Sequence, residues 1–237
     1  MVDENKLCFI VCANDEQQLQ ECAMYLSLLH VPEGCRTDLV VVKDAASMAA
    51  GYNEGMAATD AKYKIYLHQD TFIVDTLFLD KLLRVFREDE RIGMIGIIGS
   101  EHLPKDGVMW HGKRCGNFYR LEEMLERGLD GMELLSCGHR EVEAVDGFLM
   151  ATQYDLPWRE DIFQGWDFYD VSQCMEFRRA GYRIIVPEQK ENGVIHCCEA
   201  PSLQHYDEYR ELLLKEYPEI GGLIYEINPF NNQLHMI

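Results

Sequence analysis

The sequence predicts an α/β protein with a Rossmann-like, three-layer α/β/α architecture and a mostly parallel central sheet. Short, nearly continuous apolar runs such as residues 7–13 and 65–67 predict strands that are buried on both faces. Segments with helical spacing of apolar residues separate these runs, as in βαβ units. At 237 residues, 47% of them hydrophobic, the chain can form one large domain with a sizeable core.

The first 99 residues alternate strand and helix. Asn14-Asp15-Glu16 ends the first apolar run and supplies a helix N-cap, and Lys43-Asp44 ends the second run. We expect strands at 7–13, 38–42, 64–67 and 91–99, a further apolar segment at 72–74, and helices at 19–29, 45–58 and 75–87.

The remainder of the chain is less regular. Residues 100–140 scatter Gly, His, Pro and Trp and indicate a loop-rich insertion with one short helix at 121–127. Further strands are expected at 141–152, 182–186 and 194–196, with helices ending at Ala180 and spanning 206–217, and an irregular polar tail from Gly221. We expect a single domain over 1–237, in which the halves 6–99 and 100–200 share one sheet and 201–237 form a C-terminal helix and tail.

Charge and cysteine content limit the partners and the compartment. The formal net charge of −19 disfavours nucleic acid and anionic membrane surfaces, so a phosphate ester would need a metal ion or helix N-termini to bind. Nine cysteines, an odd number without a CxxC pair, suggest reduced thiols in the cytoplasm. No signal peptide and no apolar run of about 18 residues are present, which also favours a cytoplasmic protein.

Polar residues follow the first three strands. Asn14-Asp15, Asp44 and His68-Gln69-Asp70 each come where an apolar run stops. Because parallel strands end at one edge of the sheet, these residues are expected to share a ligand cleft. A carboxylate such as Asp70 could hold a divalent cation there, and the cation could hold phosphate oxygens. A strand followed by an ordinary polar turn is the alternative for each. No GxGxxG and no Walker A lysine motif occurs, so dinucleotide and P-loop chemistry are disfavoured.

These segments resemble the family 2 glycosyltransferases, and more narrowly a bacterial glycosyltransferase-like branch. Residues 14–16 resemble a strand ending in Asn-Glu, residues 40–44 (Val-Val-Val-Lys-Asp) resemble Val-Val-Asp-Asp, and His68-Gln69-Asp70 stands where the family has Asp-x-Asp. Lys43 and His68 replace acids of those motifs. The resemblance implies the type A nucleotide-diphospho-sugar transferase fold.

The rest of the family pattern follows in order over about residues 6 to 200. Residues 51–55 (Gly-Tyr-Asn-Glu-Gly) match a Gly-x-x-x-Asn-x-Gly helix loosely, and residues 146–150 (Asp-Gly-Phe-Leu-Met) resemble the Gly-Gly-Phe-Leu strand on the acceptor side. Tyr169-Asp170 resembles the Glu-Asp helix, and residues 179–183 (Arg-Ala-Gly-Tyr-Arg) resemble its Arg-x-x-Gly-Tyr ending.

The resemblance implies an inverting, metal-dependent transfer of a sugar from a UDP- or GDP-linked donor to an acceptor hydroxyl, with residues 6–99 as the nucleotide-binding half and 100–200 as the acceptor half. Asp170 would be the general base, with Asp167 as a rival. Mn²⁺ or Mg²⁺ would be held by Asp70, with His68 and His196 as further ligands. The nucleotide would contact Ala13, Asn14, Asp15, Asp44, Asn53 and Gln69, and the acceptor would contact Asp146, Gly147 and Trp166.

Structural roles compete with each assignment. Asp167 and Asp170 could cap the helix that follows them, His196 could be a core histidine, and His68 could bond a neighbouring loop. The tryptophans could stack on a sugar ring or pack in the core. Zinc bound by His196 and Cys197-Cys198 is disfavoured, because no second ligand pair lies at a suitable spacing.

A catalytically idle member that binds a nucleotide or carbohydrate as an interaction module is the alternative function, supported by the altered metal motif. Nucleotidyl transfer is disfavoured, because no basic glycine-rich loop follows the first strand.

Overall fold

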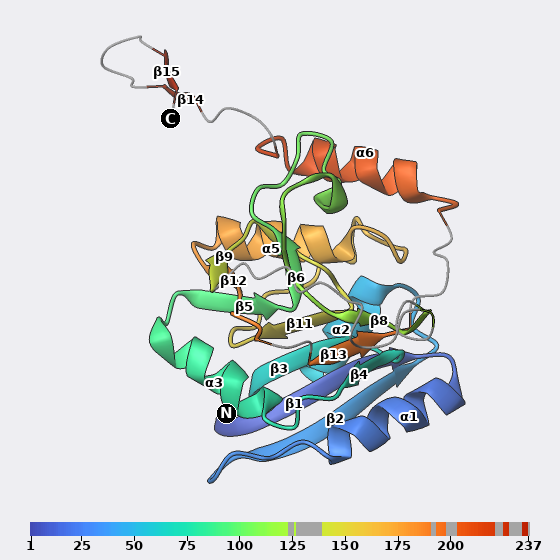
Figure 1. The fold of residues 1–237 in the computed structure, drawn as a ribbon. Helices are drawn as coiled ribbons and strands as arrows, with labels where there is room; N and C mark the ends of the chain where they lie inside the picture. The colour runs from blue at the N-terminus through green and yellow to red at the C-terminus, as the bar shows by residue number, and fades with distance from the viewer. Residues whose placement is uncertain are drawn as a thin grey trace.

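In the computed structural model the chain forms three layers, with helices on both faces of a seven-stranded sheet (Figure 1). The structure describes residues 1–122, 126, 139–190, 193–197 and 203–220, together with strands at 225–227 and 234–236. The strand order is β2-β1-β3-β11-β5-β12-β9. Five strands run parallel: β1 (Asp3–Ala13), β2 (Arg36–Lys43), β3 (Ala61–His68), β5 (Ile92–Gly96) and β12 (Arg183–Val186). Only β11 (Leu149–Thr152) and β9 (Arg140–Glu141) oppose them among the described strands of this sheet, which confirms the predicted fold class.

The side chains of β1 alternate between the two faces and so define the layers. Leu7, Phe9 and Val11 pack in one core cluster with α1 (Glu16–Ser27) and α3 (Phe78–Glu88). Cys8 and Ile10 pack in the other cluster with α2 (Met48–Ala57) and α5 (Tyr169–Arg179). A last helix, α6 (Tyr206–Glu216), lies outside α5 (Figure 1).

Two glycines set how closely α2 approaches the sheet. A Cβ added to Gly51 would collide with Cys12, and one added to Gly55 would collide with Ile10. The glycine spacing noted at residues 51–55 is therefore a packing feature, since it lets the helix backbone lie directly on β1.

Two expected strands are divided in the structure. The run 91–99 leaves the central sheet after β5 and continues as β6 (Ile98–Ser100), which pairs with β7 (Arg114–Gly116) and β10 (Ala144–Val145). The run 141–152 forms β9, β10 and β11 instead of one strand. The Asp146 carboxylate accepts a hydrogen bond from the Phe148 N–H at 3.0 Å, and this local turn replaces the strand ladder between β10 and β11.

A second small sheet bears on the site. In it β13 (Val194–His196) lies between β4 (Thr71–Ile73) and β8 (Tyr119–Arg120). A short 3-10 helix, η1 (Met109–His111), follows β6. The short helix expected at 121–127 falls largely outside the described residues.

Two further expectations, on the tail and on the cysteines, need correction. Where an irregular tail was expected, β14 (Tyr225–Ile227) pairs antiparallel with β15 (Leu234–Met236). Cys115 is disulfide-bonded, contrary to the expectation of reduced thiols. Cys8, Cys12, Cys22, Cys35 and Cys174 carry free thiols. Among the helices described here, none has the length and apolar character needed to cross a membrane.

Candidate active site

The first three strands end together at one edge of the sheet. Ala13 pairs with Lys43 across β1 and β2, and Cys12 pairs with His68 across β1 and β3. The polar residues that follow these strands therefore lie side by side, as the sequence predicts. Asp44 adopts a left-handed conformation with φ of 56°, which an aspartate tolerates better than most residues, and its side chain is exposed.

Gln69 ties the ends of β1 and β3 together. Its side-chain oxygen accepts hydrogen bonds from the backbone N–H groups of Asn14 at 3.0 Å and Asp15 at 2.9 Å, and its amide donates to the side-chain oxygen of Asn14. The Asp15 carboxylate caps α1 by accepting from the N–H groups of Gln17 and Gln18. The polar turn is thus rigid, and the side chain of Asp15 already has a structural role.

Asn53 is used elsewhere in the fold. Its amide donates to the Trp158 carbonyl at 2.9 Å, and its oxygen accepts from the Trp158 N–H at 2.8 Å. This two-point contact fastens α2 to the chain before α5, so both ends of the amide are occupied within the protein.

His68, Asp70 and His196 form a compact cluster at the edge of the sheet. Each offers one ligand atom, and these atoms lie within 4.8 Å of one another. Nε2 of His196 lies 3.3 Å from Oδ1 of Asp70, and Nδ1 of His68 lies 4.0 Å from the same oxygen. Two ligands bound at about 2.1 Å to one ion can be about 4.2 Å apart, so a divalent cation fits after a small closing movement. Imidazole nitrogens and a carboxylate suit Mn²⁺, Fe²⁺ or Zn²⁺.

The small sheet explains how His196 reaches this cluster. In β13, His196 pairs with Thr71 of β4, directly after Asp70. The Cys197 N–H donates to the Asp70 carbonyl at 3.0 Å, and the His196 ring stacks on Phe148 at 4.7 Å between ring centroids. His196 is therefore partly buried against the core and also lies beside Asp70.

The protonation states favour a cation. Burial, and then the charge of His196, lowers the pKa of His68 to about 4, so the ring is neutral at pH 7. Burial alone would raise the pKa of the Asp70 carboxyl, but the hydrogen bond and the charge of His196 hold that pKa below its usual value. A neutral imidazole and an ionised carboxylate are the forms in which these groups bind a metal.

His68 also contacts the helix that carries the candidate base. Its Nε2 atom lies 2.6 Å from the hydroxyl of Tyr169, the first residue of α5. Tyr169 is 5% exposed, and a Cβ on Gly147 would collide with its hydroxyl. The bond joins the cluster of His68, Asp70 and His196 to α5. Sequence reasoning missed Tyr169 as a site residue, although it lies directly before Asp170 in the Tyr169-Asp170 motif.

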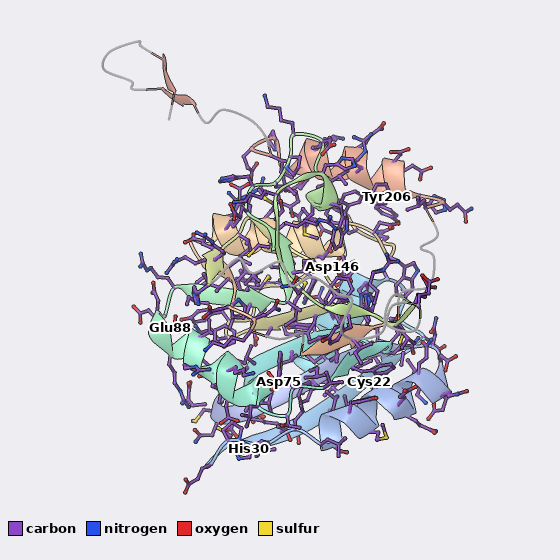
Figure 2. The ribbon with its side chains drawn as sticks, in the orientation of Figure 1. Cys22, His30, Asp75, Glu88, Asp146 and Tyr206 are labelled. Atoms are coloured by element: carbon purple, nitrogen blue, oxygen red, sulfur yellow. The ribbon has the colours of Figure 1, made fainter. Side chains whose placement is uncertain are left out.

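Asp170 and Asp146 form an acidic pair next to Tyr169. Oδ2 of Asp170 accepts from the Gly147 N–H at 3.0 Å, and Oδ1 accepts from the Val171 N–H at 2.8 Å. Burial, and then repulsion from Asp146, raises the pKa of Asp170 to about 7. Burial also raises the pKa of Asp146, which is labelled in Figure 2. A carboxyl with a pKa near 7 can take up a proton in neutral solution.

The chain just before α5 is strained and partly exposed. Phe168 precedes the helix with φ of 58°, which is costly for a bulky residue, and no side chain caps the helix there. Its ring lies 4.7 Å from that of Tyr206, labelled in Figure 2 at the start of α6. Burial raises the pKa of half-buried Asp167. Trp166 is 56% exposed and remains available to a ligand, whereas Trp158 is buried in the core at 2%.

A separate cavity lies on the α3 side of the molecule. It has a volume of about 530 Å³ and is lined by residues of α3, β5 and the segments around β12 and β13, with Asp75 and Glu88, labelled in Figure 2, among them. None of its lining residues belongs to the sets expected from the sequence.

Comparisons with known proteins agree with this fold. A family model described as "Glycosyltransferase like family" matches residues 8–217, and no curated protein matches the chain. Among solved structures, a Pyrobaculum calidifontis mannosyltransferase in complex with GDP-Man and Mn²⁺ superposes with a TM-score of 0.54 at 13% identity, over 92% of this chain and 64% of that one. The S. aureus protein TarS (residues 1–349), in complex with UDP, superposes with a TM-score of 0.55 at 12% identity, over 91% of this chain and 66% of that one. The chain thus spans slightly less than two thirds of either relative, and the likeness confirms the type A glycosyltransferase fold.

Proposed function

The chain belongs to the glycosyltransferase-like family, and from that membership we propose that it transfers a sugar from a nucleotide-diphospho-sugar to an acceptor hydroxyl. The observation that carries the proposal is the contact between the candidate metal site and the helix that bears the candidate base. A cluster of His68, Asp70 and His196 is joined through Tyr169 to Asp170, whose pKa is raised to about 7. A metal-binding donor site next to a carboxyl that can accept a proton matches what sugar transfer requires.

We place the donor at the carboxyl edge of β1, β2 and β3. Ala13, Asn14, Asp15, Asp44 and Gln69 lie there and would contact the base and ribose, whereas the occupied amide of Asn53 is left out of this set. UDP and GDP are the nucleotides to test, because solved structures of the same fold hold UDP or GDP-Man.

His68, Asp70 and His196 would hold Mn²⁺ or Mg²⁺. When bound, the ion would neutralise the negative charge that develops on the leaving diphosphate. The overall charge of −19 makes such a local cation valuable, because the chain otherwise repels a diphosphate.

Asp170 would act as the general base. It takes the proton of the acceptor hydroxyl while that oxygen bonds to the anomeric carbon on the face opposite the diphosphate. The bond from the anomeric carbon to the diphosphate oxygen breaks, the nucleoside diphosphate leaves, and the configuration inverts. Asp146, Gly147 and exposed Trp166 would line the acceptor side.

Nucleotide binding tests the donor site first. We expect UDP or GDP to raise the melting temperature in the presence of Mn²⁺, and Asp70→Ala to remove the shift. No shift with either nucleotide, with or without Mn²⁺, would sink the proposal.

Donor turnover then identifies the base. Asp170→Asn should abolish transfer and retain nucleotide binding, whereas Asp167→Asn should keep most of the activity. The reverse pattern would make Asp167 the base. Nucleotide binding that persists in EDTA, without donor hydrolysis or transfer, would instead favour the idle binding module that His68 in the metal motif suggests.

A further inference from the structure

We propose that Tyr169 is a positioning residue for the metal site, because its hydroxyl holds the His68 ring with Nδ1 directed at the ion. This inference rests on the proposed function, since it concerns the same metal site. The Tyr169 hydroxyl lies 2.6 Å from Nε2 of His68, and the opposite ring nitrogen faces Oδ1 of Asp70 at 4.0 Å. One ring nitrogen therefore faces the protein and the other faces the metal site.

The hydrogen bond fixes the tautomer as well as the orientation. A neutral imidazole carries one proton, and a metal binds the nitrogen without it. With Nδ1 facing the ion, the proton must be on Nε2, which then donates to the Tyr169 oxygen. Partners of this kind orient metal-binding histidines and raise their basicity.

Tyr169 is rigid enough for this role. Its ring is buried and lies among the rings of Tyr52, at 5.9 Å, and Trp158, at 6.1 Å. Gly147 leaves the space that the hydroxyl occupies, since a side chain there would collide with it.

The role of Tyr169 can be separated from that of Asp170. The carboxylate of Asp170 is held by the N–H groups of Gly147 and Val171 and not by the phenol. Removing only the Tyr169 hydroxyl should therefore weaken metal binding and leave these two bonds in place.

Tyr169→Phe with Mn²⁺ as the probe tests the proposal. We expect the dissociation constant for Mn²⁺, measured by calorimetry or by the EPR signal of free Mn²⁺, to rise about 10- to 100-fold. Co²⁺ would give a second readout, because a lost or reoriented imidazole ligand changes its visible absorption. The melting temperature without metal should stay close to that of the wild type, because the ring and its packing remain.

Tyr52→Phe is the matched control. Tyr52 is also buried in this aromatic group, and its hydroxyl has no hydrogen-bond partner among the described residues. The control should bind Mn²⁺ with the wild-type affinity and give the wild-type Co²⁺ spectrum. An equal loss in both variants would reveal a general packing effect and overturn the positioning role.

The remaining outcomes separate this inference from the proposed function. If the wild type binds Mn²⁺, Asp70→Ala abolishes binding and Tyr169→Phe binds within twofold of the wild type, the positioning role is wrong and the metal site stands. If the wild type binds neither Mn²⁺ nor Co²⁺, with or without UDP, the metal-dependent function and the inference both fall.

Discussion

The backbone N–H of Gly147 donates a 3.0 Å hydrogen bond to the carboxylate of Asp170, although burial raises the pKa of that carboxyl to about 7. The bond favours the ionised form, whereas burial and the nearby Asp146 oppose it, and burial is the larger effect. Asp170 is therefore placed to exchange a proton close to neutral pH.

This balance predicts the pH dependence of transfer. Because the base must be ionised, kcat/KM should rise with pH and level off above about 7. Asp146→Asn removes a neighbouring negative charge, so the acid limb of the kcat/KM profile should shift to a pH lower by roughly one unit. Rates of donor consumption across pH 5 to 9, in wild type and variant, provide the measurement. A limb that stays in place or moves up in Asp146→Asn would contradict it.

The three candidate metal-binding side chains predict which divalent ion binds more tightly. Two imidazoles and one carboxylate favour Mn²⁺ over Mg²⁺, and we expect a preference on the order of tenfold or more. His68→Asp adds a second carboxylate and should reduce the ratio of Mn²⁺ affinity to Mg²⁺ affinity. Titrations with both ions would measure this ratio. His102→Asp is the control, because that side chain is 87% exposed and outside the cluster. An equal reduction of this ratio in His102→Asp would show that the change in overall charge causes the effect.

Gly147→Ala should disturb stability and metal binding together. The added methyl group would collide with the Tyr169 hydroxyl, so we expect a loss of about 1–3 kcal/mol in the free energy of unfolding and a weaker Mn²⁺ site. Gly34→Ala is the comparison: φ is +76° and nothing lies within 4 Å of the new carbon, so it should cost about 1–2 kcal/mol of backbone strain alone. Denaturant unfolding and Mn²⁺ titration of both variants measure the two effects. Unchanged Mn²⁺ affinity in Gly147→Ala would contradict the expected collision with the Tyr169 hydroxyl.

Two asparagines should behave in opposite ways. Asn53→Ala removes both hydrogen bonds to Trp158, so about 1–3 kcal/mol of stability should be lost for each backbone group left unpaired, with nucleotide affinity unchanged. Asn14→Ala, at an exposed position on the sheet edge, should weaken nucleotide binding with little effect on stability. Melting curves and UDP titrations check both variants. If Asn53→Ala alone weakened UDP binding in still-folded protein, the nucleotide role expected from the sequence would be restored.

Apolar patterns in the sequence were enough to predict the central layers. The runs that became β1 and β3 are largely buried, whereas β2 is an edge strand with exposed residues such as Leu39. The polar ends of all three strands lie at one edge because parallel strands must end there. The division between β10 and β11 was not predictable from hydrophobicity, since both strands are buried and only the Asp146 turn separates them, whereas β9 consists of two charged, exposed residues.

The contacts that complete the site depend on tertiary pairing. His196 reaches Asp70 because β13 pairs with β4, and sequence spacing does not encode that register. Tyr169 reaches His68 because Gly147 leaves space for its hydroxyl. Both contacts join segments far apart in the chain, so local pattern alone could suggest the residues and not their meeting.

The position of β11 limits where the chain could be divided into fragments for a chimeric protein. β11 comes from the second half of the chain, yet it inserts between β3 and β5 and pairs with both. A breakpoint near residue 100 would leave one edge of β3 and both edges of β5 unpaired, because β12 also follows residue 100, and such edges promote aggregation. Fragments joined at that point therefore cannot be exchanged as independent units, and a chimera would have to carry β11 together with β3 and β5, which flank it.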